Sequence, residues 1–157
     1  MRHVRLPAPV LRATAPLLRT WWKIRQPSTF GVKVLLLHPA EPGRFLVVRH
    51  SYSDPNRWGL PGGGYRPSRE TPQEAASREI AEELTLTAAP GAFVVLETLE
   101  TTLEAKRDTL TILRVLAPST DVVPSPELAE ARWISSVEEL GDAPVSCWLT
   151  RALAHKR

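Results

Sequence analysis

The sequence is poor in cysteine, has no long apolar run and carries no acidic residue before Glu41. Its one cysteine, Cys147, can form no intramolecular disulfide, which excludes a disulfide-stabilised scaffold and is compatible with the cytosol. No apolar stretch reaches the roughly 20 residues that a membrane helix needs, and residues 1–25 lack the continuous apolar core of a signal peptide. We therefore expect a cytoplasmic chain without a membrane span.

Two common phosphate-binding loops are also missing. Three consecutive glycines occupy positions 62–64, but no Gly-Lys-Ser/Thr follows them, which excludes a P-loop. The G-x-G-x-x-G spacing of a dinucleotide-binding turn is absent as well. Because glycine lets the backbone approach a ligand closely, we expect Gly63 and Gly64 to shape a loop beside a binding site.

What is present fits one compact domain with an uneven charge. The chain has 157 residues, of which 43% are apolar and 24% charged, with a net charge of +3. Apolar residues at helical spacing in residues 9–25 predict that residues 1–28 form a basic amphipathic extension and residues 29–157 the domain. A solvated basic face is the simplest interpretation, while phosphorylated substrates, nucleic acid, an anionic membrane surface and dimerisation through residues 9–25 stay open. The basic residues before Glu41 are Arg2, Arg5, Arg12, Arg19, Lys23, Arg25 and Lys33.

Hydrophobic patterning predicts a mixed α/β (α+β) domain. The helix at residues 71–84 is the clearest element, because Thr71 can cap it, Pro72 suits its first position and Glu74 completes a capping box. A short helix is expected from Ser135 or Ser136, and a closing helix over residues 143–156. The expected strands are residues 32–38, 45–49, 93–102, 109–116 and 130–134.

Three acids on the predicted helix at 71–84 point to chemistry. Glu79, Glu82 and Glu83 stand at i, i+3 and i+4, which places their carboxylates on one face, away from the buried side given by Ala75, Ile80 and Leu84. Each like-charged pair at this spacing destabilises a helix by roughly a few tenths of a kcal/mol. A bound cation relieves that repulsion, and Mg²⁺ prefers carboxylate oxygens and bridges to phosphates.

The spacing around these acids resembles the signature of the Nudix hydrolases. Gly64 opens it, Glu70 follows after five residues, and Arg78-Glu79 follows after seven more, ahead of an aliphatic residue and the pair Glu82-Glu83. Thr85 stands where the family has glycine. Because a β-branched residue is a poor fit to positive φ, we expect the chain to leave the helix without a left-handed cap, with the turn shifted toward residues 89–91.

The resemblance implies a mixed β-sheet sandwiched between helices and hydrolysis of a phosphoanhydride in a nucleoside diphosphate linked to another moiety. It also implies Mg²⁺, or Mn²⁺, held by Glu79, Glu82 and Glu83. By the same resemblance, Arg78 has a structural role and pairs with a carboxylate. Glu70 is expected to brace the loop or a metal-bound water.

Further candidates lie outside the signature. Glu127 is the first choice for a fourth metal-binding carboxylate and Glu130 the second, with a solvated loop acid as the alternative for Glu127. Arg49, which ends the second expected strand, can reach substrate phosphates or lie on the surface. Trp58 can stack on a base, but core packing beside the glycines is favoured.

The substrate is not fixed by the sequence. The markers of ADP-ribose and diadenosine-polyphosphate hydrolases, a Pro and a Tyr after the signature, are absent, since residues 100–104 read Glu-Thr-Thr-Leu-Glu. Nucleoside triphosphates or nucleotide sugars remain. A nucleotide sensor without turnover and an RNA 5′-end pyrophosphohydrolase are the alternatives. The absence of an aromatic-interleaved RNA motif disfavours RNA as a partner.

Overall fold

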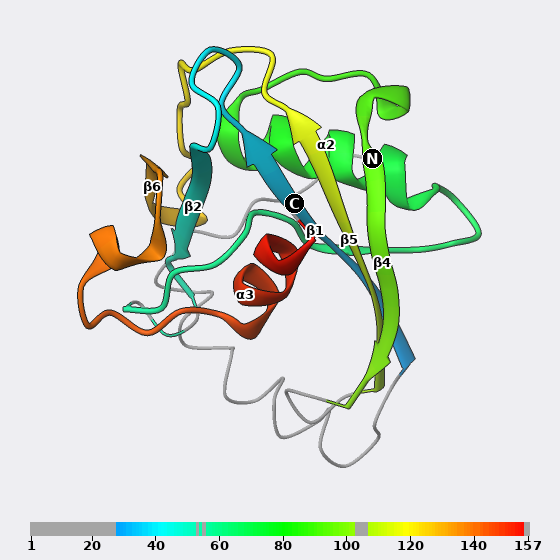
Figure 1. Ribbon diagram of the computed structural model, residues 1–157. Coiled ribbons are helices and arrows are strands. Elements are labelled where there is room, and N and C mark those ends of the chain that lie inside the picture. The colour runs from blue at the N-terminus through cyan, green and yellow to red at the C-terminus, as the bar shows by residue number, and fades with distance from the viewer. Residues whose placement is uncertain (1–27, 53, 55, 103–106, 156–157) are drawn as a thin grey trace.

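A mixed six-stranded sheet forms the centre of the computed structural model, which describes residues 28–52, 54, 56–102 and 107–155 (Figure 1). Within these residues the strand order is β4-β5-β1-β2-β6, with β3 pairing to β1. β1 runs parallel to β5 and the other strand pairs are antiparallel. The strands are β1 (Ser28–Leu37), β2 (Phe45–His50), β3 (Gly64–Tyr65), β4 (Val94–Thr101), β5 (Arg107–Leu116) and β6 (Leu128–Ile134).

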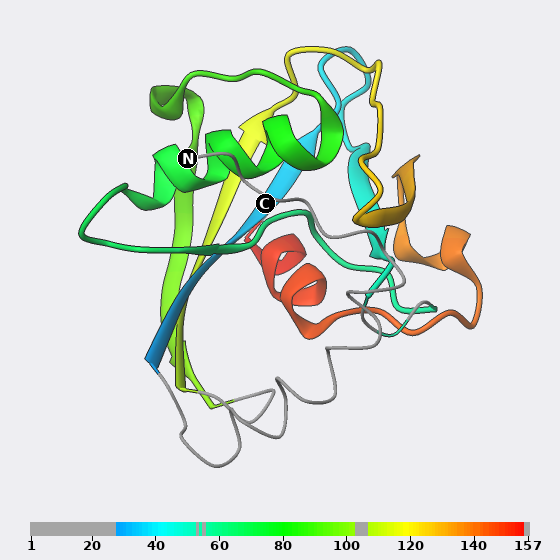
Figure 2. The same cartoon turned by 180° about the vertical axis from the view of Figure 1, so that it is seen from behind.

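The sheet has a hydrophobic core on each face, because apolar side chains alternate along its central strands. Val32 and Val34 of β1 face helix α2 (Pro72–Leu84), whereas Leu35 faces helix α3 (Cys147–Ala154). Figures 1 and 2 show these helices on opposite sides of the strands. The predicted α/β/α sandwich with a mixed sheet is therefore confirmed.

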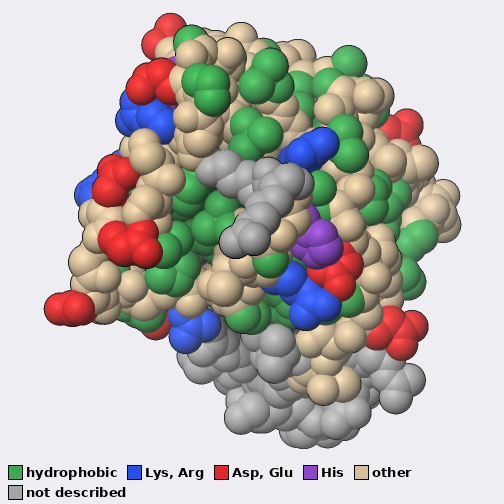
Figure 3. Space-filling model, in the orientation of Figure 1, with side chains coloured by type: hydrophobic (Ala, Val, Ile, Leu, Met, Phe, Trp, Pro, Cys, Tyr) green, Lys and Arg blue, Asp and Glu red, His purple; other side chains and the backbone are tan. Residues whose placement is uncertain are grey.

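No helix in the described part of the chain is long and apolar enough to cross a membrane. Figure 3 shows acidic and basic side chains interspersed with hydrophobic ones over one face, without a large area of a single charge sign. The predicted basic extension, residues 1–28, lies almost wholly outside the described residues, and its boundary with the domain stays a prediction.

A short segment separates the first two strands. β1 and β2 pair at Leu37↔Phe45 and then diverge, and residues 58–64 fill the space between them. On one side Gly59 forms a bridge with Val48 of β2. On the other, Val34 N–H donates to Pro61 O at 3.0 Å and Val32 N–H donates to Gly63 O at 2.9 Å. This placement brings the glycines over the sheet centre, where α2 can reach them.

The closing helix is shorter than the sequence predicts. It begins at Cys147 rather than at residue 143, because residues 144–146 pair with the backbone of Trp58. Trp58 N–H donates to Pro144 O at 2.9 Å, and Ser146 N–H donates to Trp58 O at 2.7 Å. The Ser146 side chain then caps the helix. A long-range pairing therefore outweighs helix propensity here.

The prediction that Thr85 avoids a left-handed conformation is wrong. Thr85 follows α2 at φ 60° and ψ 29°, and both its own N–H and that of Leu86 bond to Ile80 O. Its hydroxyl donates to Val123 O at 3.1 Å, and Val123 N–H donates to Leu84 O at 3.1 Å. These bonds to residues 117–127 hold a β-branched residue in a conformation that costs roughly 1–2 kcal/mol outside glycine.

Thr85→Gly is therefore expected to stabilise the fold by about 0.5–1 kcal/mol, because the strain it relieves exceeds the exposed hydrogen bond it loses. Thr85→Ala is the matched control: it keeps the Cβ atom and loses the hydroxyl, so it should destabilise. Urea titration of the three proteins checks the order. A midpoint for Thr85→Gly at or below that of the native chain would contradict this balance.

Candidate active site

The acidic helix α2 is placed by a well-defined start. Thr71 and Glu74 form the predicted capping box: Glu74 N–H donates to Thr71 Oγ1 at 3.2 Å, and Thr71 N–H donates to the Glu74 carboxylate at 2.8 Å. The buried side includes Ala75 and Ile80, as expected, but it also includes two of the acids.

Glu79 and Glu83 are buried because residues 62–64 lie over them. Glu83 has only 2% of its side chain exposed and accepts a 2.9 Å hydrogen bond from Gly62 N–H. Gly63 lies against Glu79, where an added Cβ would stand 2.6 Å from Oε1. Glu82 is different, with half of its side chain exposed. The expectation that all three acids lie off the buried side therefore holds only for Glu82.

Arg78 joins the helix to the loop before it. Its Nε and Nη2 donate to the two oxygens of Glu70 at 3.1 and 2.9 Å, and Nη2 also donates to Gly64 O at 3.2 Å. Nη1 donates to Glu79 at 2.7 Å and Glu82 at 3.4 Å. The bonds to Glu70, followed by those to Glu79, raise the pKa of Arg78. These contacts join the loop to the helix through Arg78; the structural role expected of Arg78 and the bracing role expected of Glu70 stay predictions.

Burial makes the acidic pair hard to ionise. Desolvation raises the pKa of Glu83 to about 8, with smaller contributions from the charges of Glu79 and Glu127. It also raises the pKa of Glu79, against the hydrogen bond from Arg78. These carboxylates are therefore held in a position where negative charge is poorly compensated, and a cation would stabilise their ionised forms.

Two nearby basic side chains were not identified from the sequence as site residues. Lys33 of β1 has its ammonium 3.4 Å from the carbonyl oxygens of Leu60 and Gly62. His50 ends β2 with Nδ1 3.7 Å from Glu83 Oε1, and burial, then the charge of Lys33, lowers its pKa to about 3. A single lysine within the apolar run of residues 32–37 was a signal that could have identified Lys33.

Glu127 lies within electrostatic reach of Glu83, because its charge contributes to the shift of the Glu83 pKa. The loop that carries Glu127 is hydrogen-bonded to the end of α2 and to the residue after β2. Ser125 N–H donates to Glu83 O at 2.7 Å, and Ser51 N–H donates to Glu127 O at 2.8 Å. The Glu127 side chain is exposed. Its role as a fourth metal-binding carboxylate stays a prediction.

Glu130, Arg49 and Trp58 form a separate cluster across β2 and β6. Glu130 accepts hydrogen bonds from Arg49 at 2.5 Å and from Arg132 at 2.7 Å. Burial opposes its ionisation, but these bonds keep the pKa of Glu130 below its ordinary value. Both guanidinium groups lie about 5 Å from the Trp58 ring, at 5.1 Å for Arg49 and 5.0 Å for Arg132. Trp58 is 4% exposed, so the structure places it in the core rather than open to a base.

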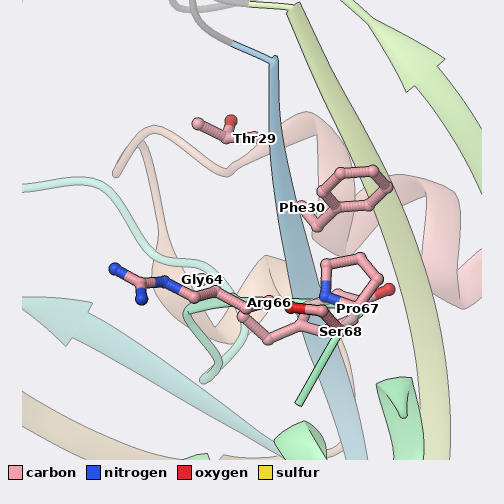
Figure 4. Close-up of a pocket in the computed structure, with 7 residues that line it drawn as sticks. Thr29, Phe30, Gly64, Arg66, Pro67 and Ser68 are labelled. Atoms are coloured by element: carbon pink, nitrogen blue, oxygen red, sulfur yellow. The ribbon is translucent and has the colours of Figure 1, made fainter. Parts of the chain in front are cut away.

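A shallow pocket of about 450 Å³ opens beside this site, between the start of β1 and the residues that follow β3 (Figure 4). Phe30 and Tyr65 meet edge to face there, with ring centroids 6.0 Å apart. Gly64 lines the pocket and also binds Arg78, so it connects the pocket with the acidic helix. None of the acids named above is among its described lining residues.

The donors present fit a hard divalent cation, since they are carboxylate oxygens held together against their mutual repulsion. In the described part of the chain, however, no three His, Cys, Asp or Glu side chains already converge as a metal cluster. One reason is that Arg78 holds Glu79 through its Oε1. The carboxylates therefore match the ligand preference of Mg²⁺, but in this structure the Glu79 carboxylate is paired with the Arg78 guanidinium.

The fold and the site together define an α/β/α sandwich in which an acidic helix packs against a glycine-rich loop. The family model for the NUDIX domain matches residues 28–149. The chain belongs to the Nudix family. No curated protein matches the chain significantly.

Solved structures share the fold. The MutT protein from Methanosarcina mazei is 26% identical with a TM-score of 0.67, over 83% of this chain and 94% of that one. A bifunctional NMN adenylyltransferase/ADP ribose pyrophosphatase from Francisella tularensis, solved with AMP and a Mn ion, is 17% identical with a TM-score of 0.70, over 94% of this chain and 48% of that one. The NUDIX domain of Shewanella oneidensis NrtR, solved with ADP ribose, is 14% identical with a TM-score of 0.66, over 82% and 86% of the two chains.

Proposed function

We propose that the protein is a divalent-metal-dependent pyrophosphohydrolase that cleaves a phosphoanhydride in a nucleoside diphosphate linked to another moiety. The observation that carries the proposal is the placement of Glu79 and Glu83, which are buried side by side on α2 under the glycine loop. Burying two carboxylates without full compensation is unfavourable for folding, and their use as ligands for a cation accounts for it.

Each residue of the site has a distinct part in this proposal. Glu79, Glu82 and Glu83 would hold Mg²⁺, with Glu127 at the edge of the site. When bound, the ion neutralises phosphate charge and lowers the pKa of bound water. Gly62 N–H fixes the orientation of Glu83, and Arg78 connects Glu70 with Glu79 and Glu82. Exposed Glu82 is the carboxylate that solvent and substrate reach directly.

The substrate class remains as the sequence predicts, a nucleoside triphosphate or a nucleotide sugar. The Mn ion bound with AMP in the Francisella protein, and the ADP ribose bound in the Shewanella domain, support a divalent ion and a nucleotide ligand here. A sensor without turnover is disfavoured, since sensing does not require three carboxylates. The cytosolic location and dimerisation stay predictions.

The test is release of phosphate or pyrophosphate from a panel of nucleoside triphosphates, nucleotide sugars and dinucleotides with Mg²⁺. We expect turnover on one class, lost with EDTA and reduced at least about tenfold by Glu82→Gln. Glu82 is exposed, so this substitution should leave the urea unfolding midpoint unchanged. Nucleotide binding without metal-dependent turnover on any member would refute the hydrolase and favour the sensor.

A further inference from the structure

Lys33 is a charged residue on the central strand of the sheet. Its neighbours Val32 and Val34 are fully buried, and Lys33 itself is partly buried. The ammonium lies 3.4 Å from both Leu60 O and Gly62 O, contacts that are long for charged hydrogen bonds. Backbone carbonyls alone therefore compensate this charge weakly.

The peptide groups of Gly62 connect Lys33 to the acidic pair. The carbonyl of Gly62 faces the ammonium, while its N–H donates to Glu83 at 2.9 Å. The backbone on either side of Lys33 is fixed, because Val32 N–H donates to Gly63 O and Val34 N–H donates to Pro61 O. β1 is therefore locked against residues 60–63 at the position of this side chain.

The charge of Lys33 acts on the groups around the proposed metal site. It favours the ionised forms of Glu79 and Glu83 and disfavours protonation of His50. Arg78 also interacts with this cluster, but Glu70 already pairs with it in a two-oxygen contact. Among the described residues no carboxylate lies at ion-pair distance from Lys33, and its charge lowers the pKa of both Glu79 and Glu83.

We propose that Lys33 sets the metal affinity of the site: its charge, which lies beside the Gly62 carbonyl on the other side of the residue whose N–H binds Glu83, weakens the binding of a divalent cation to Glu79 and Glu83. This inference rests on the proposed function, because it assumes that these carboxylates bind the metal. A fixed positive charge near the same oxygens repels an incoming dication, and the partly buried location limits screening. Lys33 is thus a positioning residue that sets metal affinity.

The test is a Mn²⁺ titration of the full chain without nucleotide, with free Mn²⁺ followed by its electron paramagnetic resonance signal. Lys33→Gln keeps an amide donor for the two carbonyls and removes the charge, and Lys33→Met removes both. We expect each to lower the Kd for Mn²⁺ by about tenfold, an order-of-magnitude value for one fixed charge in a partly screened site. Lys33→Arg should leave the Kd within about twofold of the native value, since the charge remains.

Arg44→Met is the matched control. Arg44 is also partly buried, with 31% of its side chain exposed, but it pairs with Glu41 in the turn after β1, so loss of its charge should not change the Kd. An unchanged or higher Kd in Lys33→Gln would overturn the proposal, and a loss of stability without tighter binding would make Lys33 merely structural. If Lys33→Met fails to fold, Lys33→Gln decides.

The two proposals fail in different ways. If the native chain binds no Mn²⁺, the metal-dependent function and the role of Lys33 both fall. If the native chain binds Mn²⁺ and Lys33→Gln binds it equally well, only the role of Lys33 falls, and the hydrolase proposal stands.

Discussion

Glu83→Gln is expected to reduce Mg²⁺-dependent turnover by at least about a hundredfold while making the metal-free protein more stable at pH 8. Activity should fall because a neutral amide is a poor ligand for a hard cation. Stability should rise because Glu83 is buried and burial raises its pKa to about 8, so its ionised form is disfavoured in the folded state. The amide oxygen still accepts from Gly62 N–H, and the amide nitrogen can lie toward His50 Nδ1.

The pH dependence follows from the direction of the shift. The folded protein keeps a proton on Glu83 that the unfolded chain releases above its ordinary pKa of 4.5, so stability falls as pH rises toward 8. Glu79, whose pKa is also raised, acts in the same sense. His50 acts in the opposite sense, because its pKa is lowered from 6.5 to about 3 and its contribution is lost as pH falls below 6.5. Above pH 6.5 His50 is neutral in both states, and the acids alone remain.

We therefore expect the metal-free native chain to lose roughly 2 kcal/mol of unfolding free energy between pH 6.5 and 8. In Glu83→Gln the loss should be much smaller, and saturating Mg²⁺ should remove most of it in the native chain. Urea titrations in EDTA at several pH values measure this. A native profile that is flat from pH 6.5 to 8, or parallel profiles for the two proteins, would show that Glu83 is not a buried carboxylate of raised pKa.

Local signals made α2 predictable from the sequence. The capping box of Thr71 and Glu74, with Pro72 after the cap, involves residues within one turn, and the structure has the helix where these residues place it. The acid spacing was equally local and led to the family. The prediction for Thr85 failed because the bonds that stabilise its left-handed conformation come from Val123 and the backbone near it, far along the chain. The intrinsic preference of threonine correctly indicates that a left-handed conformation is unfavourable, but it does not include the hydrogen bonds from distant residues that offset this cost.

Long-range pairing accounts for what the sequence did not reveal. Nothing in residues 58–64 indicates that they fill the space between β1 and β2, yet this insertion covers Glu79 and Glu83 and places Gly62 in contact with both Lys33 and Glu83. The same segment shortens the closing helix through Trp58. Glu130 was the second choice for a fourth metal ligand, and its position opposite Arg49 in the β2–β6 register gives it an arginine partner that the sequence did not indicate. Such outcomes depend on strand register, which local patterns do not determine.

Gly62→Ala is expected to destabilise the fold by roughly 3–5 kcal/mol, because it combines backbone strain with a steric clash. Gly62 has φ +133°, and an added Cβ would stand 2.2 Å from Val32 O. Val32 cannot yield, since its N–H is bonded to Gly63 O and its strand pairs with β5. The urea midpoint should fall sharply in metal-free buffer, where no effect on metal binding contributes.

Gly63→Ala is the comparison that separates loop packing from chemistry. Its added Cβ would meet the Glu79 carboxylate at 2.6–2.7 Å, the far end of a flexible side chain that can rotate away. We expect a stability loss below about 1 kcal/mol and a fall in turnover of at least about tenfold, because Glu79 is displaced from its proposed ligand position. If Gly63→Ala lost as much unfolding free energy as Gly62→Ala, both glycines would be required by the backbone conformation and packing of the loop, and not by the position of Glu79. Full activity in a folded Gly63→Ala would contradict the assignment of Glu79 as a metal ligand, because displacing its carboxylate would then cost no turnover.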